Sequence, residues 1–330
     1  MAPLAHHIQT DQRRAAMLRT AFCPVVRAAL EDASTIEIMV NPDGAVWVEK
    51  AGTGLIDTGD VIAAGDRERV IRLIASCSGE TASALSPIVS AELPEGDERF
   101  EGLLPPVSIS PCFSIRKPAT TPFSLGDYVD HGALAPPVAR AIENAIVARE
   151  NIVVAGGTSS GKTTFVNALL SAAALHQERI LILEDTRELN CAAPNLVQLK
   201  SSRDRISLQS LVRSTLRLRP DRIIVGEVRG GEALDLLKAW NTGHPGGVTT
   251  LHANSAHGAL GRLEQLASEA TTRLPHELIA EAVDVVIYMS RQDGARRVTE
   301  AIRVLGFDGE TYETEPLVSR SISLIQQGAT

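Results

Sequence analysis

The sequence contains few aromatic residues and few cysteines. Phe, Trp and Tyr make up 3% of its 330 residues, too few to favour a single-strand nucleic-acid binder that stacks bases on aromatic side chains. Its four cysteines lie far apart and form no Cys-x-x-Cys pair, so zinc sites and dithiol redox sites have little support. We expect all four to be reduced and buried as small apolar residues in a cytoplasmic protein.

Net positive charge and long apolar runs are also missing. Lys plus Arg total 32 against 40 for Asp plus Glu, a net charge of −8, so direct nucleic-acid binding is not indicated. No apolar run approaches the ~18 residues of a membrane-spanning helix. Residues 1–9 contain two His and no apolar core, unlike a secretory signal. At about 150 residues per domain, the length predicts two domains.

Residues 1–117 are expected to form a small α+β domain. Apolar spacing predicts the helices, and short apolar runs predict the strands, the first two joined by the turn residues Asn41 to Gly44. The helices are expected over 8–32 and 66–76, and the strands over 35–40, 45–49, 100–104 and 113–116. A cluster of Pro, Thr and Ser then predicts a linker over 118–135.

Residues 136–330 read as an α/β domain with a mostly parallel sheet. Apolar runs alternate with helical segments, which is typical of a parallel sheet covered on both faces. The strands are expected over 151–155, 179–183, 222–225, 247–251 and 284–289. The helices are expected over 136–149, 164–175, 207–219, 232–240 and 275–282.

A glycine-rich loop follows the first strand of this second domain. Residues 156–163 read GGTSSGKT, which fits the phosphate-loop pattern G-x-x-x-x-G-K-[ST] between a strand and a helix. Backbone N–H groups of such a loop surround phosphate oxygens. Lys162 is predicted to neutralise the β- and γ-phosphates of ATP, and Thr163 to ligate Mg²⁺. The predicted nucleotide-binding residues are Gly156, Gly157, Thr158, Ser159, Ser160, Gly161, Lys162, Thr163 and Thr164.

Two later strands are followed by carboxylates. Glu227 comes after the strand 222–225 and is the predicted general base, which orients a water and accepts its proton. A Walker B strand usually ends in an Asp that helps to hold Mg²⁺, but Gly226 occupies that place. Metal binding is therefore expected to depend on Thr163 and waters, with help from the acidic cluster Glu184, Asp185 and Glu188.

A histidine follows the strand 247–251. His252 is predicted to hydrogen-bond the γ-phosphate or a neighbouring loop and so to report the nucleotide state. His244 and His257 lie nearby in the sequence, but this stretch contains no carboxylate or thiol. A metal site among these histidines is therefore not expected.

Together these motifs resemble the type II/IV secretion ATPase family. The Walker A stretch and three later stretches match that family in order and spacing, and three earlier stretches resemble its conjugation and type IV branch. The later stretches are ILEDTREL, RIIVGEVRG and GGVTTLHANS; the earlier ones are RFEGLLPPV, CFSIRKP and LGDYVDHGAL. The resemblance covers about residues 20–317, and the Gly-Glu ending of the Walker B strand belongs to the family's pattern.

The resemblance implies a RecA-like P-loop ATPase domain behind a smaller amino-terminal domain. It implies a cytoplasmic homo-oligomer, a hexameric ring, peripheral at the inner membrane and docked on components of a secretion or conjugation apparatus. ATP turnover would drive substrate transfer or pilus assembly. It also implies that Arg99 and Arg116 of the amino-terminal domain meet charge that develops on the γ-phosphate. Further candidates for that role lie within the ATPase domain: Arg217, Arg219 and Arg229.

Three alternatives share the nucleotide site. A RecA-like nucleic-acid motor of the helicase type would need a basic groove or stacking aromatics, which the composition disfavours. A small-molecule P-loop kinase would transfer phosphate to an acceptor and lack a separate amino-terminal domain. A non-catalytic assembly platform would bind nucleotide without turnover.

Overall fold

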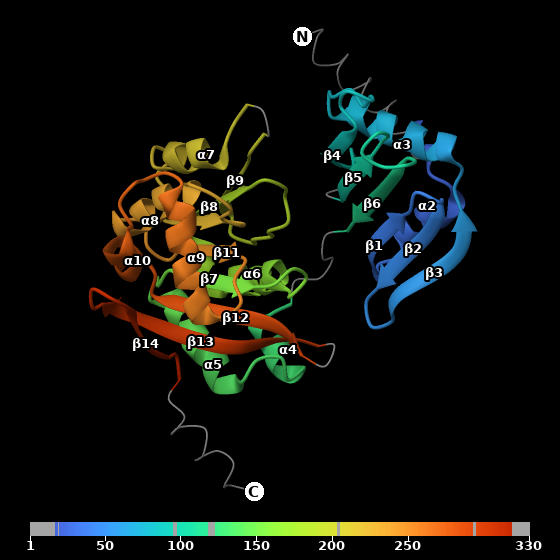
Figure 1. Ribbon diagram of the computed structural model, residues 1–330. Coiled ribbons are helices and arrows are strands. Elements are labelled where there is room, and N and C mark those ends of the chain that lie inside the picture. The colour runs from blue at the N-terminus through green and yellow to red at the C-terminus, as the bar shows by residue number, and fades with distance from the viewer. Residues whose placement is uncertain are drawn as a thin grey trace, which may run out of the picture. The chain divides into compact units, whose positions relative to one another are not determined.

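The computed structural model describes residues 17–18, 20–94, 98–117, 123–202, 205–292 and 295–318. The chain divides near Thr120 into an amino-terminal unit and a carboxy-terminal unit, each with its own sheet (Figure 1). Within the described residues, no helix combines the length and the apolar character that crossing a membrane requires.

The amino-terminal unit is built on a six-stranded antiparallel sheet with the order β3-β2-β1-β6-β5-β4. Helix α3 packs Val70, Ile71 and Ile74 into a core that includes Phe100 and Ile115 of the sheet. The strands are β1 (Thr35–Val40), β2 (Ala45–Lys50), β3 (Gly54–Val61), β4 (Ile88–Glu92), β5 (Arg99–Leu103) and β6 (Cys112–Arg116); the helices are α2 (Pro24–Glu31) and α3 (Ala64–Cys77). The predicted α+β class of this unit is therefore confirmed.

The predicted long helix 8–32 differs from the structure. Helix α2 begins at Pro24, and Cys23 before it is extended, with φ −66° and ψ 162°. Proline disfavours the helical conformation in the residue that precedes it, so the helix starts anew there. Residues 8–16 of this prediction lie outside the described part of the chain. Edge strands β3 and β4 were not predicted, because the apolar alternation of β3 is interrupted by glycines and aspartates.

The carboxy-terminal unit is an eight-stranded sheet with the order β14-β13-β12-β7-β11-β10-β8-β9. The six strands from β12 to β9 run parallel, and β13 and β14 add an antiparallel edge. The strands are β7 (Ile152–Gly156), β8 (Arg179–Glu184), β9 (Asn195–Lys200), β10 (Arg222–Val225), β11 (Val248–Leu251), β12 (Val285–Gln292), β13 (Ala295–Phe307) and β14 (Tyr312–Pro316). This confirms the predicted mostly parallel α/β sheet.

Helices cover both faces of this sheet (Figure 1). Along β7 the side chains of Val153 and Ala155 join one apolar core, and those of Ile152 and Val154 join the other. The first core is closed by α7 (Leu208–Thr215), α8 (Glu232–Asn241), α9 (Ala256–Ser268) and α10 (His276–Ala282); the second is closed by α4 (Leu125–Asp130), α5 (Pro136–Val147) and α6 (Lys162–Leu170). Burial on both faces explains why the central strands read as continuous apolar runs.

Part of the expected linker 118–135 is folded onto the carboxy-terminal unit. Helix α4 lies within that range, and its N-cap Ser124 exchanges hydrogen bonds with Asp127 in a capping box. Leu125, Tyr128 and Leu134 are buried in the core that α6 also lines. The sequence did not predict α4, because its short apolar pattern directly follows the cluster of Pro, Thr and Ser residues that indicated a linker. The expected helix 164–175 also differs, since α6 ends at Leu170 and a 3₁₀ turn follows over Ala173–Gln177.

Candidate active site

The phosphate loop connects the end of β7 to the start of α6, and its shape requires glycine at positions 156 and 161. A Cβ on Gly156 would lie 2.5 Å from the carbonyl oxygen of Met289 and from Ser160 Oγ. Gly161 has φ +95° and Ser159 has φ +58°, both in the left-handed region. Glycine adopts that region without steric cost, whereas a residue with a Cβ does so only when its surroundings hold it there.

Lys162 lies inside this loop, with 8% of the residue exposed. Its Nζ donates to the carbonyl oxygens of Gly156 at 3.0 Å and Gly157 at 2.9 Å. Burial lowers the pKa of Lys162, partly opposed by the charge of Glu227. A buried ammonium whose nearest partners are neutral carbonyl oxygens is suited to an anionic ligand. The buried Ser160 Oγ, without a hydrogen-bond partner among the described residues, fits the same ligand, a nucleotide phosphate chain.

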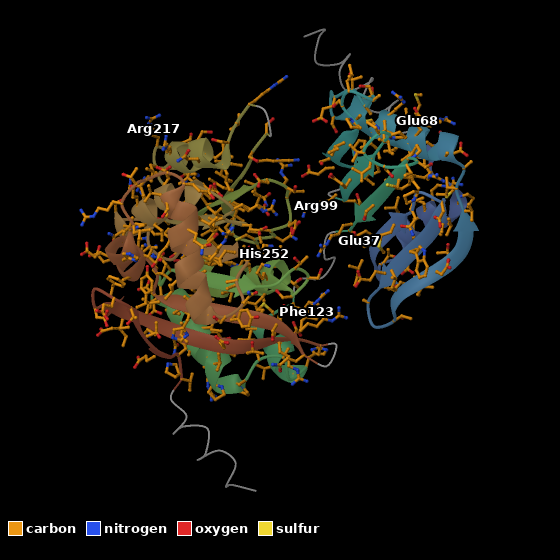
Figure 2. The ribbon with its side chains drawn as sticks, in the orientation of Figure 1. Glu37, Glu68, Arg99, Phe123, Arg217 and His252 are labelled. Carbon is orange, nitrogen blue, oxygen red and sulfur yellow. The ribbon has the colours of Figure 1, made fainter. Side chains whose placement is uncertain are left out.

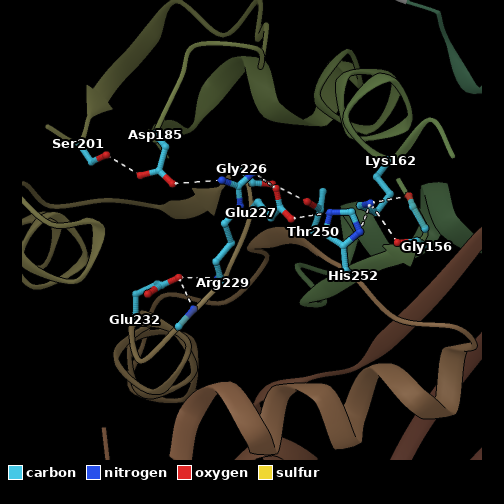
Figure 3. Close-up of polar contacts among 12 residues, drawn as sticks. Gly156, Lys162, Asp185, Ser201, Gly226, Glu227, Arg229, Glu232, Thr250 and His252 are labelled. Carbon is cyan, nitrogen blue, oxygen red and sulfur yellow. Dashed lines mark hydrogen bonds and ion pairs between the residues drawn. The ribbon is translucent and has the colours of Figure 1, made fainter. Parts of the chain in front are cut away.

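Glu227 is the second residue after β10, and its carboxylate lies between two basic side chains (Figure 3). Its Oε2 accepts a 2.6 Å hydrogen bond from Arg229 Nη2, and its Oε1 lies 3.0 Å from His252 Nε2. Oε1 is buried and accepts no well-directed hydrogen bond from the described residues. This oxygen is therefore placed to accept a hydrogen bond from a water.

His252 connects the lysine to the glutamate (Figure 3). Its Nδ1 lies 3.4 Å from Lys162 Nζ, on the side of the ring away from Glu227. Burial and, next, the charge of Lys162 lower the pKa of His252, so the ring is neutral at pH 7. Because an ammonium can only donate, Nδ1 is the acceptor and Nε2 carries the proton that faces Glu227.

The glycine that replaces the usual Walker B aspartate has a packing reason. A Cβ on Gly226 would lie 3.0 Å from Glu184 Cγ, and Glu184 itself is 4% exposed. Glu184 Oε1 accepts hydrogen bonds from the backbone N–H groups of Glu188 and Leu189, both at 2.9 Å. The Glu184 carboxylate therefore holds the turn after β8 through these two hydrogen bonds. Because Gly226 has no side chain, the Glu184 side chain has room to lie there.

The acidic residues near the loop do not assemble a metal site by themselves. The described residues contain no group of three or more His, Cys, Asp or Glu side chains that could hold a metal ion. Asp185 Oδ1 accepts from Ser201 Oγ at 2.5 Å, and its Oδ2 lies 4.0 Å from Arg229 Nη1 (Figure 3). A Mg²⁺ ion at this site would thus depend on Thr163, waters and the phosphates as well, and Thr163, Glu184 and Glu188 stay its predicted protein ligands.

The predicted arginines fall into different places. In the amino-terminal unit, Arg99 of β5 is directly opposite Arg116 of β6, and Glu37 of β1 is opposite Arg116. All three alternate with buried residues and so lie on the sheet face turned away from the core. Figure 2 labels Arg99 and Glu37 in this unit. In the carboxy-terminal unit, Arg217 and Arg219 are exposed after α7.

Two arginines near the loop, Arg229 and Arg296, are distinguished by contacts that the sequence does not show. Arg229 was one of three equal candidates, and only its contact with Glu227 distinguishes it. Arg296 of β13 was missed altogether, although its Nε donates to the carbonyl oxygen of Ser159 at 3.1 Å. It lies 137 positions from that serine, and no local pattern in the sequence connects the two.

Comparison with known proteins shows which family this chain is similar to. Residues 68–302 match the family model described as "Type II/IV secretion system protein". The chain is 50% identical over 289 residues to the conjugal transfer protein TrbB of Rhizobium radiobacter, covering 87% of this chain and 89% of that protein. It is 31% identical over 341 residues to the type IV secretion system protein VirB11 of Bartonella henselae, covering 89% and 94%.

A solved structure supports the fold. The Legionella pneumophila ATPase DotB aligns with a TM-score of 0.60 at 19% identity, covering 94% of this chain and 97% of that chain. At this identity the likeness concerns the fold alone. It agrees with an α/β unit of RecA-like type preceded by a smaller unit.

Proposed function

The chain belongs to the Type II/IV secretion system protein family, and we propose that it is an ATP-hydrolysing motor of a type IV secretion or conjugation apparatus. The observation that carries the proposal is the line of contacts from Lys162 through His252 to Glu227. It joins a buried cation in a phosphate loop to a carboxylate whose buried Oε1 lies beside His252 but accepts no well-directed hydrogen bond from the described residues.

The residues divide the hydrolytic reaction between them. Lys162 leaves the carbonyls of Gly156 and Gly157 and binds the β- and γ-phosphates of ATP. Glu227 Oε1 orients a water and accepts its proton as the water attacks the γ-phosphorus. The bond from the γ-phosphorus to the bridging oxygen breaks, and ADP leaves. A Mg²⁺ ion held by Thr163 would supply charge neutralisation on the phosphate oxygens.

His252 is the residue that reports the nucleotide state. In the present arrangement it accepts from Lys162 and faces Glu227 with its N–H. When Lys162 turns to the phosphates, Nδ1 loses its donor. The contact between His252 Nε2 and Glu227 Oε1 then changes. In this way the position of the base depends on whether a γ-phosphate is bound.

The proposed assembly is a cytoplasmic homohexameric ring, peripheral at the inner membrane. The names of the relatives, conjugal transfer and type IV secretion system proteins, support a conjugation or secretion apparatus as the partner. In this ring Arg99 and Arg116 supply positive charge toward the γ-phosphate, and hydrolysis moves one unit against the other.

Nucleotide titration and native mass measurement test this function together. The wild-type chain should bind Mg-ATP and form a six-subunit species. Lys162→Ala should bind it at least about tenfold more weakly, because the charge that faces the phosphates is lost while the loop backbone remains. Equal affinity in the two proteins would remove the nucleotide site. Hydrolysis that required added nucleic acid would instead favour a helicase-type motor.

A further inference from the structure

The hairpin of β12 and β13 lies beside the phosphate loop. Strand β12 pairs with β7, and its Met289 is opposite Gly156. Strand β13 pairs with β12 on the other side, with Arg296 opposite Arg291. The hairpin therefore carries Arg296 to the loop from a distant part of the sequence.

Arg296 contacts the loop in two ways. Its Nε donates to the carbonyl oxygen of Ser159 at 3.1 Å. Its Cδ and Cβ lie 3.1 Å and 3.7 Å from the position that a Cβ on Gly161 would take, so the stem of the arginine lies alongside this glycine. Arg296 thus lies against the most unusual stretch of the loop, from Ser159 at φ +58° to Gly161 at φ +95°.

The contact with Ser159 determines which way one peptide group points. In a trans peptide the C=O of Ser159 and the N–H of Ser160 point in opposite directions. Because the C=O points to Arg296, the N–H of Ser160 points away from it, toward Gly157, whose carbonyl oxygen it meets at a long 3.4 Å. A phosphate oxygen would offer this N–H a stronger, charge-assisted acceptor.

We propose that Arg296 is a positioning residue for nucleotide binding, which holds the Ser159 carbonyl outward so that the Ser160 N–H faces the phosphates. This inference rests on the proposed nucleotide site. Lys162 holds the first carbonyls of the loop from within, and Arg296 holds the Ser159 carbonyl from outside. The two cations act at opposite sides of one loop, and only Lys162 moves to the ligand.

The variants Arg296→Gln and Arg296→Lys test the proposal in the full-length protein, with Arg297→Gln as the matched control. Arg297 is the next residue of β13 and is exposed on the opposite face. Arg296→Gln should raise the Kd of both ATP and ADP about tenfold, the loss expected for one charge-assisted hydrogen bond. The kcat at saturating ATP should change less than about threefold, because binding rather than the transition state is affected.

Two further readouts separate positioning from general stability. Amide hydrogen exchange of residues 157–161 in the nucleotide-free protein should be faster in Arg296→Gln and unchanged in Arg297→Gln. Arg296→Lys, which keeps a positive charge and a donor, should show an intermediate Kd. Wild-type Kd and exchange in Arg296→Gln would overturn the proposal. So would a fall in thermal midpoint that matches the loss of affinity and is not relieved in Arg296→Lys. Failure of the wild-type protein to bind ATP would instead reject the proposed function.

Discussion

At the scale of single residues, the reactive groups of this chain are connected through a neutral histidine. Lys162 and His252 are 90 positions apart in sequence and meet at 3.4 Å. The sequence predicted the role of each separately, because each follows a strand of one sheet. Only the structure shows that His252 accepts from the lysine and faces Glu227, so that a change at one end of the line alters the other.

Replacing His252 by alanine should separate nucleotide binding from turnover. The variant keeps Lys162 and the loop backbone, so its affinity for ATP should remain within about threefold of wild type. Its hydrolysis should fall about tenfold or more, because Glu227 loses the partner that lies beside Oε1. Parallel titration and phosphate release measure the two quantities. Wild-type turnover would leave His252 with a structural role only.

The pKa of His252 should depend on Lys162. The lysine charge is the second cause, after burial, that lowers this pKa, so Lys162→Ala should raise it. A depressed histidine pKa means that its contribution to stability is complete above the ordinary value near 6.5 and is lost as pH falls through the folded-state value. An NMR titration of the His252 ring in both proteins measures the change. A pKa that stayed the same or fell would contradict the contact.

At the scale of elements, close packing between a helix and a strand limits which residues the strand accepts. A Cβ on Gly247, just before β11, would lie 1.9 Å from Trp240 Nε1. That indole of α8 is buried and donates to the carbonyl oxygen of Ile223 at 3.1 Å. The Trp240 indole therefore joins α8 to β10 and packs against the start of β11. Gly247 makes this possible because it leaves room for the ring.

The substitution Gly247→Ala should lower the free energy of unfolding by about 1–3 kcal/mol or more, since the indole must move and its hydrogen bond is strained. Gly261 of α9 offers the control, because a Cβ there would meet nothing within 4 Å. Gly261→Ala should be neutral or stabilising by up to about 1 kcal/mol. Denaturant unfolding of both variants compares them. Equal stability of the two would mean that the indole does not pack as described.

The extent to which elements could be predicted follows from their burial. The central strands β7, β8 and β10 are buried on both faces and read as apolar runs, so the sequence placed them and the carboxylates after them. Edge strands and α9 were missed, because their apolar residues are interspersed with polar ones or glycines. The role of Glu184 in its turn and the approach of Arg296 depend on chain packing and have no local signal.

At the scale of the whole molecule, each of the two units contains some of the residues proposed to act in ATP hydrolysis. The carboxy-terminal unit contains the phosphate loop, Glu227 and His252. The amino-terminal unit carries the adjacent pair Arg99 and Arg116 on the exposed face of its sheet, beside Glu37. Two neighbouring cations on one face repel each other, and a nearby anion relieves that repulsion. Glu37 is one such anion, opposite Arg116, and a nucleotide phosphate would be a further one.

The paired arginines should therefore be needed for turnover and not for folding. Arg99→Ala and Arg116→Ala should keep the thermal midpoint and native mass of the wild type but lose about 10³-fold or more in hydrolysis. The fragment 119–330 should bind ATP and hydrolyse it poorly for the same reason. Phosphate release by each protein provides the measurement. Full turnover by the fragment would confine catalysis to the carboxy-terminal unit.

The central claim is that this chain hydrolyses ATP with Glu227 as the base. Phosphate release from Mg-ATP by the wild-type chain and by Glu227→Gln, with ATP affinity measured in both, tests it most directly. The glutamine is nearly isosteric but cannot accept the proton, so binding should be retained while turnover falls by about 10²–10⁴. No phosphate release by the assembled wild-type chain, or a loss of less than about tenfold in the variant, would contradict the account.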